Sequence, residues 1–499
     1  MGSTFAGLEI SKRGMSAQQS ALYTTGQNIS NANTPGYTRQ RVNFKATDAY
    51  PYPGLEMPKI PGQQGTGVEG GSIQRIRDSF LDVQFRGEST KTGYYGARAQ
   101  ALESMEEIMN EPSETGLSKT MDRFWQSLED LAANPRNSGA RSVVKERGIA
   151  VADTFQYLST SLKKVQDNLK SEMDLSATQV QSLATQLKNV NKQISEIEPH
   201  GYLPNDLYDE RDRIIDELSS LVPIKVSDPI KSGGNALPIA EGMAVVEILK
   251  KDGTSAGKLV DGLNSSTFSM DYEDGLVTGM NIGGTSVAVT DIQETGKIQG
   301  LASSHGYKDA GAAKGEYVDM LNDLNSLAES FAEEFNKVHA DGLNLKDFAT
   351  SPPGKSAVKF FEYTPGQGAD SIRISDKIME STDYIAASKG EIGNGDNALA
   401  LGKVKSGSVT IDGKSTSVQN FYEGMIGNMA VQAQESDRML KNSTTLKDSV
   451  ELRRQSVSAV SLDEEMTNMI QFQHAYNASA RMITMQDELL DTIINKMGL

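Results

Sequence analysis

Apolar residues recur in alternating steps of four and three along residues 461–497. The series contains Leu462, Met466, Met469, Tyr476, Ala480, Ile483, Leu490, Ile494 and Met497, with Gln473 and Asp487 as polar interruptions. This heptad spacing predicts a long amphipathic helix with one narrow apolar stripe that needs another helix against it. Ser461 and Glu464 predict a capping box at its start. Gly498 stands where the helix should end.

The amino-terminal segment offers a partner for this helix. Its apolar positions keep the same spacing and are Phe5, Leu8, Met15, Leu22 and Ile29. Lys12, Gln19 and Gly26 occupy the alternate positions, so this stripe is half polar. We interpret the two ends as an antiparallel coiled coil, although two core helices of one globular fold would show a similar pattern. The length favours the coiled coil, because globular helices average about 10–14 residues.

The segment between the two ends predicts a helical rod. A stripe from Phe155 to Ile197 contains no Gly or Pro, which indicates one very long helix or two collinear helices joined near Asp174. Shorter helices are expected at 117–131, 207–221, 317–338 and 421–454. Alternating runs separated by Asp-Gly turn signals at 252–253 and 274–275 predict a small antiparallel β-domain.

The expected fold is therefore mainly α with β-rich inserts (α+β), elongated and nested. Residues 1–60 and 455–499 form a terminal coiled-coil domain in this prediction. Residues 61–223, 300–343 and 418–454 form the helical rod. A β-rich insert spans 224–299, and a smaller irregular insert spans 344–417. Such inserts face outward from a stem and tolerate variation.

Composition excludes several classes of function. The chain of 499 residues carries a formal net charge of −17, which argues against binding to nucleic acid or to an anionic membrane. No run of about 18 apolar residues is present, which predicts no membrane-spanning helix. The first 30 residues lack the pattern of a cleavable signal peptide. The chain contains no cysteine, which removes disulfides and thiolate metal sites.

No catalytic constellation emerges from the motifs. The histidines at 200, 305, 339 and 474 lack the spacing of a zinc protease, and we expect surface or packing roles for them. The glycines of residues 65–70 match a dinucleotide-binding pattern without its strand and helix, so a β-turn is the expected use. The carboxylates of residues 206–216 alternate with Arg211 and Arg213, as on a solvated, ion-paired helix face. We predict a protein that is not an enzyme and has no metal or cofactor.

Residues 27–38, Gln-Asn-Ile-Ser-Asn-Ala-Asn-Thr-Pro-Gly-Tyr-Thr, break the first helix. The motif residues are Asn28, Asn31, Asn33, Pro35, Gly36 and Tyr37. This stretch resembles the amino-terminal motif of the axial proteins of the bacterial flagellum, which include rod, hook and hook-associated proteins. Residues 110–131, residues 204–212 and the carboxyl end from Ser461 are similar to one branch, the FlgK family of the hook–filament junction. The resemblance covers nearly the whole chain and is thinnest in the β-rich inserts.

The resemblance implies a structural protein of the extracellular flagellum, exported through the flagellar type III channel without a cleaved signal peptide. It implies a homo-oligomeric ring between the hook protein and a second hook-associated junction protein. An export chaperone is expected on the carboxyl-terminal helix. The terminal helices of this family are typically disordered in the free monomer. We therefore expect the two apolar stripes to order on assembly and to form its interface.

Two alternatives remain open within this reading. The chain could be hook protein or another axial subunit, although residues 110–131 and 204–212 argue against this. It could also be a junction subunit whose β-rich inserts have an adhesive surface. A cytoplasmic coiled-coil scaffold is a third possibility, which predicts that no protein is found in sheared flagella.

Overall fold

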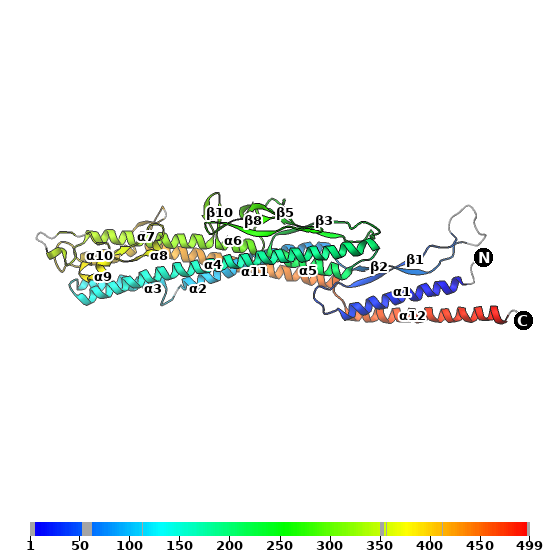
Figure 1. Cartoon of the computed structure of the whole chain (residues 1–499). Coiled ribbons are helices and arrows are strands. Elements are labelled where there is room, and N and C mark those ends of the chain that lie inside the picture. Colours follow the sequence, from blue (N-terminus) through cyan, green and yellow to red (C-terminus); the bar gives the residue numbers. More distant parts are fainter. Residues whose placement is uncertain are drawn as a thin grey trace.

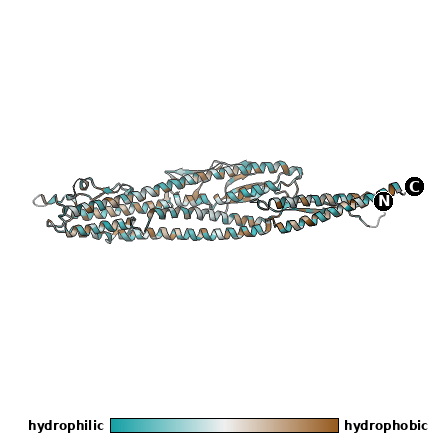
Figure 2. Ribbon diagram, turned by 90° about the horizontal axis from the view of Figure 1, so that it is seen from below, coloured by the Kyte–Doolittle hydropathy of each residue, from teal (hydrophilic) through white to brown (hydrophobic). Residues whose placement is uncertain are grey.

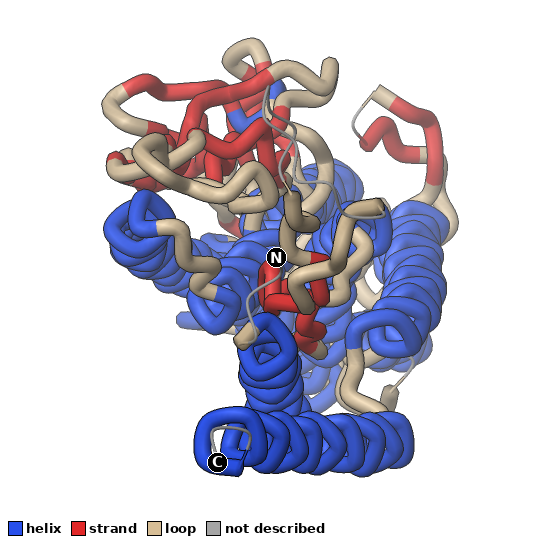
Figure 3. The backbone as a smooth tube through the Cα atoms, turned by 90° about the vertical axis from the view of Figure 1, so that its right-hand side faces the viewer, coloured by secondary structure: helices blue, strands red, loops and turns tan. Residues whose placement is uncertain are grey.

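The computed structural model describes residues 5–51, 62–111, 113–349, 354–355, 357–411 and 413–496. They form a long rod from which the two terminal helices extend together at one end (Figure 1). The view along the rod shows most of the strands gathered on one side of the helices (Figure 3). The expected class, mainly α with β-rich inserts, is confirmed.

Twelve α-helices lie in the described part of the chain. They are α1 (Ala6–Ser30), α2 (Ser79–Met109), α3 (Leu117–Ala133), α4 (Ser138–Ile197), α5 (Asn205–Leu221), α6 (Lys297–His305), α7 (Glu316–Asp341), α8 (Gly368–Ser371), α9 (Asp376–Glu380), α10 (Asp396–Gly402), α11 (Val418–Ser458) and α12 (Leu462–Asp491). A π-helical turn, Thr492–Lys496, continues α12. The 60-residue α4 is a single helix that runs through Asp174 without a break.

The strands form five small sheets in the same part of the chain. They are β1 (Gln40–Ala46), β2 (Val68–Arg75), β3 (Ile224–Ile230), β4 (Met243–Leu249), β5 (Ser255–Asp261), β6 (Asn264–Ser265), β7 (Phe268–Glu273), β8 (Leu276–Ile282), β9 (Thr285–Ala288), β10 (Tyr307–Asp309), β11 (Ala312–Lys314), β12 (Phe361–Glu362), β13 (Arg373–Ile374), β14 (Val409–Ile411) and β15 (Lys414–Thr416). The predicted turn at Asp274-Gly275 joins β7 to β8, and both residues have positive φ angles.

Apolar side chains fill the space between the rod helices. In α4, the residues from Phe155 to Ile194 that follow the predicted stripe are almost all buried. Phe124 of α3 contacts Phe331 and Phe335 of α7, and Trp125 packs beside them. Helix α11 runs antiparallel along α2, since Gly96 lies near Leu440 and the Tyr422 hydroxyl donates to Glu111. The rod is thus a bundle with a continuous core, as its periodicity predicts.

Buried residues of both inserts belong to that core. The β-rich insert contains two sheets, one in the order β3-β4-β5-β6 and the other in the order β11-β10-β8-β7 with β9 beside β8. Asn191 of α4 donates to the carbonyls of Ala244 and Gly262 and accepts from the amide of Ala244, which fastens the first sheet to the rod. Strands β10 and β11, which follow residue 299, complete the second sheet.

The glycines of residues 65–70 do not form the expected β-turn. Gly70 and its neighbour Gly71 lie inside β2, which pairs antiparallel with β1 across a bulge at Asn43 and Phe44. A Cβ on Gly71 would lie 3.4 Å from the carbonyl oxygen of Asn43, so a small residue suits this irregular pairing. The pairing joins residues on both sides of the predicted boundary at 60/61.

His339, near the end of α7, is buried. Its Nε2 accepts a hydrogen bond from the amide of Ala386 at 2.9 Å, and its Nδ1 donates to the carbonyl of Val358 at 2.8 Å. These partners require the neutral imidazole. Burial, with a smaller contribution from Arg141, lowers the pKa of His339 to about 4. His339 is therefore a packing residue, as predicted.

Because the imidazole of His339 is buried and neutral, we expect the free energy of unfolding to fall as the pH is lowered. The folded-state pKa lies below the ordinary value, so its contribution is complete above about pH 6.5 and is lost as the pH falls toward 4. Between pH 7 and pH 5 the free energy of unfolding should fall by about 2 kcal/mol through this residue. His339→Gln should reduce that pH dependence by this amount, as measured by urea unfolding. His474→Gln, at an exposed position, should leave the pH dependence unchanged.

Candidate functional site

The paired terminal helices form the first part of the site. Helix α1 runs antiparallel along α12, with Gly7 beside Gln486 and Gly14 beside Ser479. Near the rod, Asn28 Nδ2 donates to Glu465 Oε2 at 3.1 Å. These three pairs follow one heptad position on each helix. The antiparallel terminal pair is therefore present within one chain, and apolar positions recur along both of its helices (Figure 2).

The structure divides the predicted stripe residues into three groups. Those half-buried in the terminal pair are Leu8, Met15, Leu22, Ile29, Met469, Tyr476, Ala480, Ile483 and Leu490, and those exposed are Phe5, Leu462, Met466 and Ile494. Met497 lies outside the described residues. The residues at the centre of the contact between α1 and α12 are more polar than those of the predicted stripes. As assembly residues, all of these positions stay predictions.

The predicted capping box at the start of α12 is wrong. Helix α12 does begin after Ser461, but the Ser461 side chain makes no capping hydrogen bond. Glu464 instead binds Arg39 Nη1 at 2.7 Å, and Glu465 binds Arg39 Nε at 2.7 Å. An ion pair to a residue before β1 therefore replaces the local cap, and it ties α12 to the start of the strand pair.

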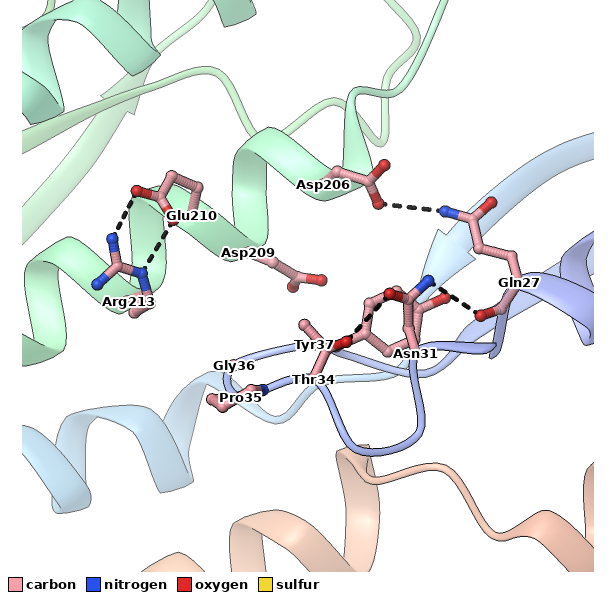
Figure 4. Close-up of a pocket in the computed structure, with 10 residues that line it drawn as sticks. All are labelled: Gln27, Asn31, Thr34, Pro35, Gly36, Tyr37, Asp206, Asp209, Glu210 and Arg213. Atoms are coloured by element: carbon pink, nitrogen blue, oxygen red, sulfur yellow. Dashed lines mark hydrogen bonds and ion pairs between the residues drawn. The ribbon is translucent and has the colours of Figure 1, made fainter. Parts of the chain in front are cut away.

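The motif after α1 folds into a compact turn against α5 (Figure 4). The Thr34 amide donates to the Asn31 carbonyl, and Gly36 has a φ of +82°, which favours glycine. The Tyr37 hydroxyl donates to Asn28 Oδ1 at 2.9 Å. Burial, together with nearby carboxylates, raises the pKa of Tyr37. Asn33 and Pro35 are exposed.

The turn is held to α5 by hydrogen bonds. The Thr38 amide donates to Asp209 Oδ2 at 3.0 Å. The Gln40 amide donates to Asn28 Oδ1, and Asn28 donates back to the Gln40 carbonyl at 2.8 Å. A cavity of about 230 Å³ remains between the turn and α5, lined by Gln27, Asn31, Asp206, Glu210, Arg213 and the turn itself. The motif thus connects the terminal helices to the rod.

A buried cluster of arginines and carboxylates supports this connection between the terminal helices and the rod, which we call the joint. Asp212 of α5 lies 3.0–3.6 Å from guanidinium nitrogens of Arg75, Arg77, Arg86 and Arg211. Burial alone would raise the pKa of Asp212, but these arginines outweigh it and hold the pKa well below its ordinary value. The cluster joins β2, α2 and α5.

Further carboxylates extend the cluster, among them Glu241, which binds Arg75 at 2.6 Å. Asp209 binds Arg75 at 2.7 Å, and burial raises its pKa. Asp216 binds Arg86 at 2.7 Å and Arg454 of α11 at 2.5 Å. We expected a solvated face here, and this is wrong for Asp209, Arg211 and Asp212, which are buried. Glu210 and Arg213 do pair near the surface. The alternation of charges signalled the ion pairs, but their burial depends on β2 and α2.

The charged side chains of the joint are arranged for a rigid contact rather than for a chemical reaction. Its carboxylates are matched by arginines, which suits a rigid connection between helices and strands. Within the described ranges, no group of three or more His, Cys, Asp or Glu side chains is arranged to hold a metal ion. No helix in that part of the chain has the length and apolar character needed to cross a membrane.

Comparisons with known proteins agree with this geometry. Residues 8–38 match the family model "Flagella basal body rod protein", and residues 454–496 match "Flagellar basal body rod FlgEFG protein C-terminal". The paired terminal helices thus define a protein of the flagellar rod and hook class. Residues 102–355 match "Flagellar hook-associated protein FlgK helical domain". The chain belongs to the FlgK family of flagellar hook-associated proteins.

Individual relatives support this assignment. Flagellar hook-associated protein 1 of Bacillus subtilis is 47% identical over 511 aligned residues, which cover 100% of this chain and 99% of that protein. Flagellar hook-associated protein 1 of Escherichia coli is 24% identical and covers 97% and 98%. The solved flagellar hook junction protein FlgK of Burkholderia pseudomallei shares the fold, with a TM-score of 0.57 and 14% identity over 76% of this chain and 100% of that one.

Proposed function

We propose that this chain is a structural subunit of the bacterial flagellum that assembles as a ring at the junction between hook and filament. Family membership over the full length supports the location. The observation that carries the mechanism is the exposed apolar surface of the terminal helices. Leu462, Met466, Ile470, Met485 and Leu489 of α12 are each about half exposed, whereas the stripe of α4 is buried.

The terminal helices order on assembly in this proposal. The structure supports this because α12 buries very little against α1, so its own chain offsets only part of the entropy cost of ordering. Neighbouring subunits supply the missing burial. The apolar residues of both stripes then act at the assembly interface.

The partners follow from the proposed position. Hook protein contacts one side of the ring, and a second hook-associated junction protein contacts the other. An export chaperone covers the exposed face of α12 before secretion. The protein acts through assembly alone and is neither an enzyme nor a binder of cofactor, nucleic acid or membrane. Its matched, buried charges support this, because they serve the joint.

Incorporation into flagella tests the proposal. The double variant Met466→Asp and Ile470→Asp places two charges on the exposed face of α12 without touching the rod core. We expect this variant to fold and to be absent from sheared flagella, because buried unpaired charges between subunits are unfavourable. Leu175→Asp, at an exposed position of α4, is the matched control and should still be incorporated. Normal incorporation of the double variant would contradict the proposed role of α12.

Amide hydrogen exchange tests the ordering step. Residues 6–30 and 462–491 should exchange rapidly in the dilute monomer and slowly in isolated flagella, while α4 remains protected in both. Equal protection of the terminal helices in the monomer would show that the ends order before assembly.

A further inference from the structure

The chain contains a single Asn-Gly pair, Asn394-Gly395, directly before α10. Asn394 is half-buried, and its Oδ1 accepts a hydrogen bond from the Asp396 amide at 2.7 Å. Its Nδ2 donates to Asp396 Oδ2 at 2.9 Å. An Asx turn of this kind folds the side chain over the peptide that lies between, which here is the peptide to Gly395. The Cγ carbon of Asn394 is therefore held beside the Gly395 amide.

The Gly395 amide is available to react with that carbon. Within the described part of the chain, its N–H has no hydrogen-bond acceptor, since the Asx turn uses the next amide instead. Gly395 also carries no side chain that would shield its nitrogen. The hydrogen bond to Asn394 Oδ1 polarises the Cγ carbonyl, as donors to a reacting carbonyl do. A nucleophile and a polarised carbonyl thus lie in neighbouring residues.

We propose that Asn394 is a site of spontaneous deamidation. Once hydroxide has removed its proton, the Gly395 nitrogen forms a bond to Asn394 Cγ, and the bond from Cγ to Nδ2 breaks with release of ammonia. The product is a cyclic imide. Water then opens the imide at either carbonyl, which leaves aspartate or isoaspartate, whose main chain runs through Cγ and is longer by one methylene group. The proton that hydroxide removed leaves with the ammonia, so water is the only reagent consumed.

The longer main chain of isoaspartate does not fit this site. Gly393 and Gly395, on either side of Asn394, both lie against residues at the connection between α3 and α4. A Cβ on Gly395 would lie 2.1 Å from the carbonyl oxygen of Ala132, and a Cβ on Gly393 would lie 3.4 Å from Arg136 Cδ. The added methylene group therefore has little free space, and isoaspartate should push the start of α10 away from α3.

The start of α10 is connected to a buried part of the core. Asn397 Nδ2 donates to the Ala386 carbonyl at 2.6 Å, and the Ala398 amide donates to the Ala387 carbonyl at 3.1 Å. The Ala386 amide in turn donates to His339. Isoaspartate should therefore loosen both α10 and the segment that contacts His339.

Mass spectrometry of the full-length chain tests the site without any substitution. Asn137 is the internal control, because its Oδ1 also accepts from the amide two residues on, at 2.8 Å, and it is exposed, but Ser138 follows it. During incubation at neutral pH and physiological temperature, Asn394 should convert at least about tenfold faster than Asn137, because glycine leaves the attacking nitrogen unshielded. The rate should rise with pH, because hydroxide takes part. Equal or slower conversion at Asn394 overturns the inference.

Asn394→Ser tests the structural consequence. Serine keeps a side-chain oxygen that can accept from the Asp396 amide but has no amide group to lose. After incubation, the unsubstituted chain should lose hydrogen-exchange protection at residues 386–387 and 396–402 in proportion to its isoaspartate content, whereas Asn394→Ser should keep it. Full protection in chains that carry isoaspartate would overturn the loosening of α10. If Asn394→Ser does not fold, the comparison of Asn394 with Asn137 still decides the proposed site.

Discussion

Replacing Asp212 with asparagine is expected to destabilise the rod by about 4 kcal/mol. The side chain is buried among Arg75, Arg77, Arg86 and Arg211, and its charge is the one carboxylate charge that all four share. Asparagine preserves the shape but removes the charge, and its amide group adds donors that face four guanidinium groups, which are donors themselves. The guanidinium groups then remain buried with too few acceptors. Breaking a buried pair in this way is far more costly than removing a surface pair.

Urea unfolding followed by the fluorescence of Trp125 measures this effect. Glu210→Gln is the matched control on the same helix. Glu210 pairs with Arg213 near the surface, so its loss should cost less than about 1 kcal/mol. Hydrogen exchange should show the loss of protection concentrated in α5 and β2. A change below about 1 kcal/mol for Asp212→Asn would mean that the cluster does not hold the joint.

Gly93→Ala is expected to destabilise the protein by about 3 kcal/mol or more. Gly93 lies where α2 crosses the end of α5 and the start of α6. A Cβ at this position would lie 2.1 Å from the carbonyl oxygen of Ser220 and 3.1 Å from the amide nitrogen of Lys297. Both are backbone atoms, so a change of side-chain rotamer cannot relieve the clash. The helices would have to separate, which opens gaps around Tyr94 and Ala97.

Gly87→Ala, on the same helix, is expected to have the opposite effect on stability. No atom lies within 4 Å of a Cβ at Gly87, and the residue is helical and exposed. Alanine should therefore stabilise the protein by about 1 kcal/mol through the higher helix propensity of alanine. The two substitutions make the same chemical change, so their difference in urea midpoint isolates the close helix crossing. Similar effects of both would contradict this packing.

The rod helices were the most predictable part of the fold. The apolar stripe of α4 extends over many turns without Gly or Pro, and such a signal survives any arrangement of the neighbouring helices. The turn at Asp274-Gly275 is local in the same sense, because positive φ angles suit these two residues. The glycines of residues 65–70 misled the prediction. Strand β2 takes its partner from residues 40–46, beyond the reach of a local pattern.

The candidate site was predictable in its location but only partly in its chemistry. The motif of residues 27–38 indicated the joint, and the charges of residues 206–216 indicated ion pairs. The burial of Asp212 could not be read from α5 alone, because its arginines come from β2, α2 and α5 together. The capping box at Ser461 failed for a similar reason. Arg39 competes for Glu464 from more than 400 residues away in the chain.

The sequence by itself determined that this protein is a helical rod with β-rich inserts and two terminal helices that pair, because periodicity and turn residues act locally. It also carried the residues that place the chain in its family. Only the tertiary structure decided which face of α12 meets α1. A heptad pattern defines a stripe to within about one residue, whereas the ion pair from Glu465 to Arg39 fixes the start of α12 through a residue that is distant in the chain. Leu462, Met466 and Ile470 then lie exposed.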